Sequence, residues 1–320
     1  MKELLTIADQ HHFAVPAFNI SNYAMFNGIM DISEKLDAPV ILEIHPLELR
    51  HIGTDVVAAI KARAAVSKVP VVIHMDHGAC FEDIMTAICA GFTSVMIDAS
   101  SLPLEENIAA CRKVVEAAHG AIHCITAEKF GGDVLEGGEV TSGREYTRSQ
   151  YANNVSVEAE LGNIGSIDEA KGTVTEGLHY TEPEEAVSFV QATGIDTLAI
   201  AIGTCHGVYP DGYEPHIQID RLKAIHKALR DAGLDTCLVL HGGSGNPPEE
   251  LKEAAANGIA KINISSDIKN AYYGKMREIL SDLKVREPNV IEPPCIQAMK
   301  ETAADRIRWF GAEGKAALYR

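Results

Sequence analysis

The chain has 320 residues, and its 45 acidic and 28 basic side chains give a formal net charge of −17 at pH 7. This charge excludes a basic nucleic-acid-binding surface as a property of the whole chain, and no apolar run approaches the ~20 residues that a membrane span needs. The seven cysteines are scattered without a Cys-x-x-Cys pair, and the first residues lack the hydrophobic core of a signal peptide, so we expect a cytoplasmic protein.

Short apolar runs alternate with longer amphipathic segments along the chain. Eight runs are rich in Val and Ile and lack polar alternation, which is typical of strands covered on both faces. In chain order, the predicted strands are residues 13–20, 39–45, 70–77, 94–99, 155–162, 197–204, 237–243 and 261–266. Helical periodicity predicts helices over residues 23–36, 54–67, 81–90, 104–118, 184–193, 217–232, 248–257, 267–283 and 294–310.

Eight strand-then-helix units predict the α/β class and a single (β/α)8 TIM barrel over residues 1–320, with extra C-terminal helices. An open doubly wound sheet is the alternative, but the regular spacing and the missing glycine fingerprint of a dinucleotide cofactor favour closure. Residues 120–154 interrupt the alternation of predicted strands and helices, because they are rich in Gly, Thr, Ser and charged residues. They lie between a helix and the fifth strand, so we predict an inserted segment on the N-terminal face, away from the chemistry.

The C-terminal ends of the predicted strands are unusually polar, and barrel enzymes place their chemistry at these ends. The eight ends carry Asn19, His45, Asp76 with His77, Asp98, Glu160, His206, His241 and Asn263. At three of them, an imidazole is followed directly by glycine: His77, His206 and His241. Three imidazoles that converge on one rim predict a metal site, and zinc with an open fourth position suits them best.

Three carboxylates accompany the histidines. Asp76 directly precedes His77, so it is a candidate acid/base beside the metal, and the alternative is a partner that orients an imidazole. Asp98 and Glu160 lie on adjacent predicted strands, where they could hold a second cation or brace the metal ligands.

Two segments with the character of an anion site follow the seventh and eighth strands. One reads Gly242-Gly243-Ser244-Gly245, the other reads Asn263-Ile264-Ser265-Ser266-Asp267, and each precedes a predicted helix. Backbone N–H groups and hydroxyls at helix starts bind anions, and barrels often place a phosphate site after these two strands. The sequence therefore predicts phosphate binding next to the metal site.

In this order, the motifs resemble those of class II ketose-bisphosphate aldolases, nearer the tagatose-bisphosphate branch. They are His74-Met75-Asp76-His77, Met96-Ile97-Asp98, Ser156-Val157-Glu158-Ala159-Glu160-Leu161-Gly162, Ala201-Ile202-Gly203-Thr204-Cys205-His206-Gly207-Val208-Tyr209, Leu240-His241-Gly242-Gly243-Ser244-Gly245 and Lys261-Ile262-Asn263-Ile264. The resemblance extends over residues 4–315 apart from the 120–154 segment.

This resemblance implies a metal-dependent, reversible aldol cleavage of a ketose 1-phosphate or 1,6-bisphosphate of the fructose or tagatose type. The products would be dihydroxyacetone phosphate and an aldehyde, and the family forms homodimers or homotetramers. The resemblance implies that His77, His206 and His241 are Zn²⁺ ligands, that Asp76 exchanges a proton, and that Asp98 and Glu160 could hold a second divalent or monovalent cation. The implied substrate-binding residues are Asn19, Gly207, Gly242, Ser244, Asn263 and Ser266, to which the phosphate segment after strand eight adds Ser265. The implied loop acid/base is Asp168 or Glu169.

The sequence also departs from the family pattern in places that bear on the substrate. Strand two ends in Glu43-Ile44-His45, where the family has a small residue, so we expect Glu43 or His45 to alter contacts with the aldehyde half. A lysine that often helps to bind the donor phosphate is missing after Tyr209. The alternatives are the same donor chemistry with a non-phosphorylated or sugar-acid aldehyde, a zinc hydrolase on the same barrel, or a non-catalytic sugar-phosphate-binding subunit. We expect a small phosphorylated sugar as partner, without nucleic acid or membrane.

Overall fold

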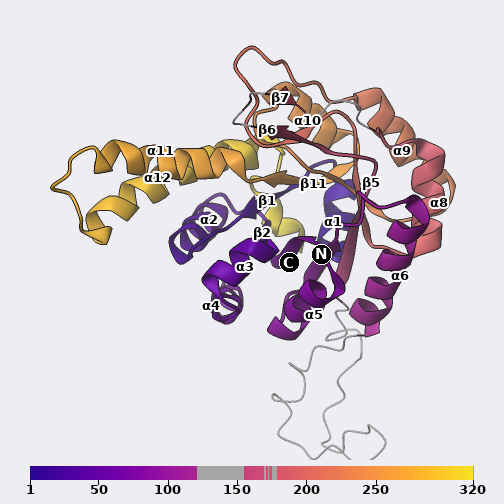
Figure 1. The fold of residues 1–320 in the computed structure, drawn as a ribbon, viewed down its shortest axis with the longest axis horizontal. Helices are drawn as coiled ribbons and strands as arrows, with labels where there is room; N and C mark the ends of the chain where they lie inside the picture. The colour runs from indigo at the N-terminus through magenta and orange to yellow at the C-terminus, as the bar shows by residue number, and fades with distance from the viewer. Residues whose placement is uncertain (121–154, 169–170, 172, 175–178, 320) are drawn as a thin grey trace, which may run out of the picture.

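A computed structural model describes residues 1–120, 155–168, 171, 173–174 and 179–319 (Figure 1). Eight parallel strands form a closed barrel in the order β1-β11-β10-β8-β5-β4-β3-β2, which confirms the predicted (β/α)8 fold. These strands are β1 (Val15–Asn19), β2 (Val40–Ile44), β3 (Val71–Gly78), β4 (Ser94–Ile97), β5 (Ser156–Leu161), β8 (Thr197–Ile200), β10 (Cys237–Leu240) and β11 (Ile259–Ile264). Each corresponds to one predicted strand.

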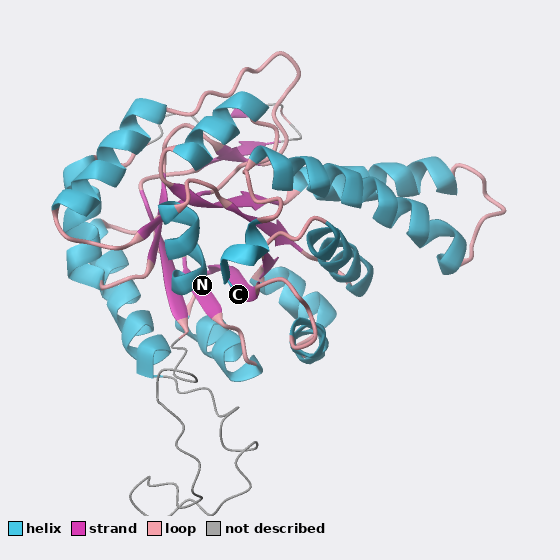
Figure 2. Cartoon of the chain, turned by 180° about the vertical axis from the view of Figure 1, so that it is seen from behind, coloured by secondary structure: helices cyan, strands magenta, loops and turns pink. Residues whose placement is uncertain are grey.

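Helices surround the barrel, as Figure 2 shows from the opposite side. They are α2 (Tyr23–Lys35), α3 (Pro46–Ile52), α4 (Asp55–Ala64), α5 (Phe81–Ala90), α6 (Leu104–Gly120), α8 (Pro183–Thr193), α9 (Ile219–Asp231), α10 (Pro248–Ala256) and α11 (Ser266–Leu280). Glycines in the left-handed region end α5 and α8, at Gly91 with φ 96° and Gly194 with φ 72°. A left-handed residue after a helix favours glycine, which is why these residues mark the helix ends in the sequence.

Two helices are absent from the sequence prediction. One is α1 (Lys2–Gln10), which packs beside β10 and β11. The other is α3, which begins directly after β2 because His45 caps it: the backbone N–H of Leu47 donates to His45 Nδ1 at 3.1 Å. Helix starts are usually capped by Ser, Thr, Asp or Asn, so an imidazole cap gives no sequence signal.

The predicted C-terminal extension is confirmed. Helix α12 (Pro288–Trp309) packs along α11, and the two project together from the barrel (Figure 1), before a short 3₁₀ turn at Lys315–Tyr319. The root of α12 also packs on α2, where a Cβ at Gly28 would lie 2.5 Å from Met299 Cε. A side chain at this position would force Met299 to shift, so glycine favours the close approach of these two helices.

A small three-stranded sheet lies outside the barrel order. It consists of β6 (Gly165–Asp168), β7 (Thr173–Val174) and β9 (Cys205–His206), with β6 parallel to β9 and antiparallel to β7. The register pairs Ser166 with His206. The segment that follows β5 is thereby fixed beside one of the predicted metal ligands.

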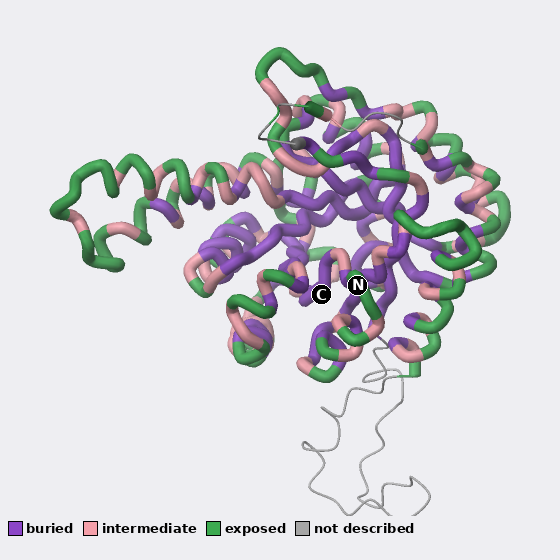
Figure 3. The backbone as a smooth tube through the Cα atoms, viewed as in Figure 1, coloured by how far each residue is buried: buried purple, intermediate pink, exposed green. Residues whose placement is uncertain are grey.

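Buried residues are concentrated in the strands at the centre, while the outward faces of the helices are exposed (Figure 3). Of the predicted insertion, only Gly120 is described, as the last residue of α6; residues 121–154 lie outside the described residues. Within the described ranges, none of the helices combines the length and the hydrophobicity that crossing a membrane requires.

Candidate active site

A cavity of about 630 Å³ opens at the C-terminal ends of the barrel strands. Thirteen of the residues predicted from the sequence line it: Asn19, His45, Asp76, His77, Asp98, Glu160, His206, Gly207, Gly242, Ser244, Asn263, Ser265 and Ser266. His241 is completely buried beside them, with its Nδ1 3.1 Å from His77 Nε2. The folded barrel thus brings together residues from the ends of all its strands.

The three imidazoles form a compact cluster. The ring centroid of His77 lies 4.9 Å from that of His206 and 4.7 Å from that of His241. One nitrogen atom from each ring lies within 4.8 Å of the chosen nitrogen of each of the other two rings. Among the described residues, the buried Nε2 of His206 has no hydrogen-bond partner. Three nitrogen donors with such an orphaned atom fit a divalent metal of the zinc type.

Carboxylates orient two of these rings. His77 Nδ1 donates to Asp98 Oδ2 at 2.8 Å, and His241 Nε2 donates to Glu158 Oε1 at 2.9 Å. The remaining nitrogens, His77 Nε2 and His241 Nδ1, therefore face each other across the centre of the cluster. Carboxylate–histidine pairs of this kind fix the tautomer and the orientation of metal-binding imidazoles.

The electrostatics of the cluster favour a cation. Burial lowers the pKa of His77, but the neighbouring carboxylates of Asp76, Asp98 and Glu160 raise it to about 10. Burial and the charge of Asp98 raise the pKa of Glu160 to about 8. His77, Asp98 and Glu160 also form a second group of potential ligand atoms within 4.8 Å. The crowded carboxylates could therefore serve either a second cation or the orientation of the histidines.

The backbone at His77 explains how two consecutive residues reach the same cavity. Consecutive side chains of a regular strand point to opposite faces. Here, the register between β3 and β4 shifts between Met75 and Gly78, and His77 has a φ of 51°. A left-handed non-glycine residue is strained, and such strain is concentrated at functional sites. The irregularity turns the side chains of both Asp76 and His77 toward the cavity.

Asp76 is held by two amides. Asn19 Nδ2 donates to Asp76 Oδ2 at 2.7 Å, and Asn263 Nδ2 donates to Asp76 Oδ1 at 3.2 Å. Burial raises the pKa of the Asp76 carboxyl, but the charges of His77 and His241 outweigh it and hold this pKa well below its usual range. Asp76 is therefore a fixed, deprotonated group that can accept a proton from a bound molecule.

The residues of the predicted anion site meet at the start of α11. Ser244 Oγ accepts the backbone N–H of Asp267 at 3.2 Å, so the loop after β10 contacts the first turn of this helix. Gly242 has a φ of 62°, and a Cβ there would lie 2.5 Å from the carbonyl oxygen of Cys205. Free N–H groups at a helix start and the close backbone approach that glycine permits both suit a phosphate group.

The two candidate loop acids lie at the edge of the described chain. Asp168 is the last residue of β6, and Glu169 lies outside the described residues. Because β6 runs parallel to β9 and pairs with it at His206, the strand that ends at Asp168 lies beside the imidazole cluster.

Sequence reasoning missed three residues with polar side chains that line the cavity: Glu48 on α3, Ser100 after β4 and Lys269 on α11. Glu48 and Lys269 lie within helices, away from the strand ends on which the sequence analysis concentrated. The expectation that Glu43 contacts the substrate is wrong, because its side chain has no exposed surface and does not line the cavity. Of the two candidates on strand two, only His45 does so.

Glu43 instead belongs to a buried charged cluster inside the barrel. Lys261 Nζ lies 2.8 Å from Glu43 Oε1 and donates to Glu158 Oε1 at 2.8 Å. All three side chains are 0% exposed, whereas barrel interiors are usually filled by Val, Ile and Leu. Burial lowers the pKa of Lys261, but the two carboxylates outweigh it and hold this pKa above its usual range. Glu158 also accepts a hydrogen bond from His241 Nε2, so the charged cluster inside the barrel helps to orient this imidazole.

Removing the central cation should destabilise the protein strongly. We expect Lys261→Met to lower the free energy of unfolding by about 3–5 kcal/mol, because it leaves the buried Glu158 carboxylate without its nearest counter-charge and Glu43 without its partner. Denaturant unfolding of the metal-free protein measures this change. The matched control is Lys252→Met, at an exposed pair with Glu249, which should cost less than ~1 kcal/mol. Equal unfolding midpoints for both variants would contradict the role given to Lys261.

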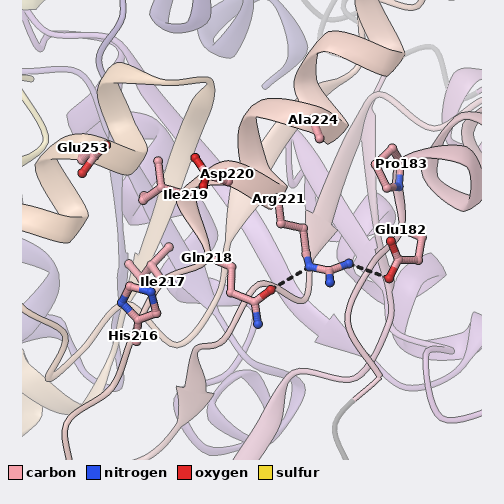
Figure 4. A pocket seen from close by; sticks show the side chains of 10 residues that line it. All are labelled: Glu182, Pro183, His216, Ile217, Gln218, Ile219, Asp220, Arg221, Ala224 and Glu253. Atoms are coloured by element: carbon pink, nitrogen blue, oxygen red, sulfur yellow. Dashed lines mark hydrogen bonds and ion pairs between the residues drawn. The ribbon is translucent and has the colours of Figure 1, made fainter.

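A second cavity, of about 650 Å³, is lined by residues at the starts of α8 and α9 and by Glu253 of α10 (Figure 4). Its Arg221 is held by Glu182 and by Gln218, each at 2.7 Å. None of the residues predicted from the sequence lines it. The chemistry-bearing residues of the described chain are instead gathered in the cavity at the strand ends.

The fold and the site define the class of this protein: a (β/α)8-barrel enzyme whose strand ends combine three imidazoles, a buried aspartate and a helix start suited to an anion. The family model described as "Fructose-bisphosphate aldolase class-II" matches residues 1–134 and 136–315. The chain therefore belongs to the class II fructose-bisphosphate aldolase family, whose members are metal-dependent aldolases of the lyase class that act on phosphorylated sugars.

Individual relatives agree with this assignment. The chain is 36% identical to a fructose-bisphosphate aldolase of Staphylococcus aureus, over 99% of this chain and 98% of that protein. It is 35% identical to a fructose-bisphosphate aldolase of Staphylococcus epidermidis, with the same coverage of 99% and 98%. Among solved structures, the YdjI aldolase of Escherichia coli K12 matches with a TM-score of 0.76 and 30% identity, over 98% of each chain.

Proposed function

We propose that this protein is a zinc-dependent aldolase that reversibly cleaves a ketose 1-phosphate or 1,6-bisphosphate into dihydroxyacetone phosphate and an aldehyde. The observation that carries the proposal is the position of Asp76. This buried carboxylate lies beside the imidazole cluster, between Asn19 and Asn263, in the same cavity as the anion-binding start of α11. A metal, a proton acceptor and a phosphate site side by side are what an aldol cleavage of a sugar phosphate needs.

Each part of the substrate has a counterpart in the cavity. His77, His206 and His241 would hold the metal, and zinc suits their nitrogen donors. When bound, the metal supplies Lewis-acid stabilisation of the negative charge that develops on the ketose C2 oxygen. The donor phosphate would meet Gly207, Gly242, Ser244, Ser265 and Ser266, while Asn263 would contact the adjoining carbons. Binding at both points orients the ketose for cleavage.

In the cleavage direction, Asp76 accepts the proton of the C4 hydroxyl. The C4–O bond becomes the carbonyl of the leaving aldehyde, the C3–C4 bond breaks, and its electron pair stays on the donor half. A proton delivered to C3 completes dihydroxyacetone phosphate. We propose that Asp168 or Glu169 delivers this proton, since β6, which pairs with β9 at His206, ends at Asp168. Condensation follows the same steps in reverse.

The direct test is the release of dihydroxyacetone phosphate from a panel of ketose 1-phosphates and ketose 1,6-bisphosphates with both configurations at C4. The purified protein is assayed as isolated, after treatment with a chelator, and after zinc is restored. We expect release that the chelator abolishes and zinc restores. Absence of release from every substrate, with zinc bound at one equivalent, would refute the proposed function.

The phosphate site gives a separate prediction. We expect Ser244→Ala to raise KM for a ketose 1-phosphate by about 10- to 100-fold, because one hydrogen bond to a charged phosphate contributes about 1.5–3 kcal/mol. Steady-state kinetics measure this change, and zinc content should stay the same. Unchanged KM would instead favour a reaction that needs no donor phosphate, such as hydrolysis by a zinc-bound water.

Further properties are part of the proposal. Asp98 and Glu160 are candidates for a second divalent or monovalent cation, since they form a potential ligand group with His77. We propose a cytoplasmic homodimer or homotetramer, as the family resemblance and the scattered cysteines suggest. The predicted placement of residues 120–154 on the N-terminal face belongs to the same set of proposals.

A further inference from the structure

On the side of the cavity next to β1 and β2, four polar side chains stand beside the residues proposed for the phosphate, and one of them, Lys269, comes from the first turn of α11. We call this side the acceptor wall and define it by Asn19, His45, Glu48 and Lys269, all of which line the cavity. Asn19 holds Asp76, the group proposed to take the C4 proton. Asn263, the other partner of Asp76, is assigned to the donor half, so we infer that the carbons from C4 onward lie on the Asn19 side, against this wall.

The lysine of the acceptor wall is already paired. Lys269 Nζ lies 3.0 Å from Glu48 Oε1, and Ser21 Oγ donates to the same oxygen at 2.9 Å. Burial raises the pKa of Glu48, but Lys269 and Ser21 outweigh it and keep this pKa below its ordinary value. Glu48 is therefore an anion at neutral pH, and the charges of the pair cancel.

His45 presents a neutral hydrogen-bond donor. Its Nδ1 accepts the backbone N–H of Leu47, so the proton of the neutral ring is on Nε2. Burial lowers the pKa of this imidazole, which favours the neutral form. The wall thus offers an N–H donor from His45, a carboxylate acceptor from Glu48, an amide from Asn19 and an ammonium from Lys269, without net charge.

A second phosphate would be poorly matched here. Among the described residues that line the cavity, Glu48, Asp76, Asp98 and Glu160 carry carboxyl groups, whereas Lys269 is the single Lys or Arg. A phosphate dianion near Lys269 would also approach Glu48, and like charges brought together cost several kcal/mol. Hydroxyl groups both donate and accept, so they match a neutral wall of mixed donors and acceptors.

We propose that the acceptor wall binds an uncharged, polyhydroxylated aldehyde half, so that the protein cleaves ketose 1-phosphates in preference to ketose 1,6-bisphosphates. Glu48 is the specificity-determining residue, because it neutralises the lysine that a terminal phosphate would need. This inference rests on the proposed aldolase function and names the substrate class for it.

The test compares kcat/KM of the zinc-loaded protein for fructose and tagatose 1-phosphates with that for the corresponding 1,6-bisphosphates. We expect the 1-phosphates to be preferred by at least about tenfold. Glu48→Gln removes the negative charge and leaves Lys269 unpaired, so we expect kcat/KM for the bisphosphates to rise about tenfold relative to the 1-phosphates. The control is Glu116→Gln, an exposed carboxylate on α6, which should leave the ratio unchanged. Zinc content and melting temperature verify that both variants are folded.

The outcomes separate the inference from the function beneath it. A wild-type preference for bisphosphates would overturn the inference and leave the aldolase function intact. So would a Glu48→Gln variant that changes both substrate classes equally, since Lys269 would then serve the donor phosphate common to both. Absence of dihydroxyacetone phosphate from all four substrates would instead refute the proposed function itself.

Discussion

Replacement of His77, His206 or His241 by alanine, one at a time, is expected to remove bound metal and turnover together. The three rings supply the nitrogen donors of the proposed site, and each variant leaves only two. Even the loss of a group that merely orients a ligand lowers metal affinity or activity by about 10- to 100-fold, so the loss of a ligand should cost more. Zinc content after gel filtration against a weak chelator, with kcat/KM on the same samples, measures both effects.

The control for these variants is His216→Ala. His216 is an exposed imidazole paired with Glu250 outside the strand-end cavity, so its loss should change neither quantity. A variant at position 77, 206 or 241 that keeps one equivalent of zinc and normal turnover would exclude that histidine from the ligand set.

Asp76→Ala is expected to keep the metal and to lose cleavage. Its carboxylate lies 3.7 Å from His77 Nε2 and is held by Asn19 and Asn263, so the imidazole cluster does not depend on it as a ligand. A positioned acid/base contributes about 10²–10⁴-fold to the rate, and we expect kcat to fall by that factor. Single-turnover release of dihydroxyacetone phosphate, at matched zinc content, measures the loss.

Chemical rescue distinguishes proton transfer from a structural role. Added formate can enter the space left by the Asp76 side chain and accept the C4 proton, so it should restore part of the lost rate. If Asp76→Ala keeps a kcat within a few-fold of wild type without formate, Asp76 is not the proton acceptor and only orients a neighbouring imidazole.

The sequence by itself determined the architecture and most of the candidate site. Eight apolar runs with polar ends are sufficient to predict a closed barrel, because parallel strands covered on both faces must be apolar and must end at one rim. For that reason, His77, His206 and Asp76 could be assigned to one cavity before any contact was known. The helix and strand boundaries follow from local periodicity and glycine stops, which are properties of short segments.

Other features were decided only by the tertiary structure. Asp76 and His77 share the cavity because β3 shifts register and His77 adopts a left-handed backbone, and alternation along a strand predicts the opposite. Glu43 turns inward because Lys261, more than two hundred residues later, supplies its counter-charge inside the barrel. Contacts between residues so distant in sequence leave no local pattern.

The acceptor wall is another feature that the sequence alone does not predict. Glu48 and Lys269 come from two helices, α3 and α11, and neither is at a strand end. Their 3.0 Å contact exists only because closure of the barrel brings β2 and β11 to either side of β1. The sequence thus indicated the reaction class through a family resemblance carried by residues at the strand ends. The charge balance that selects the aldehyde half depends on a pairing that only the closed barrel creates.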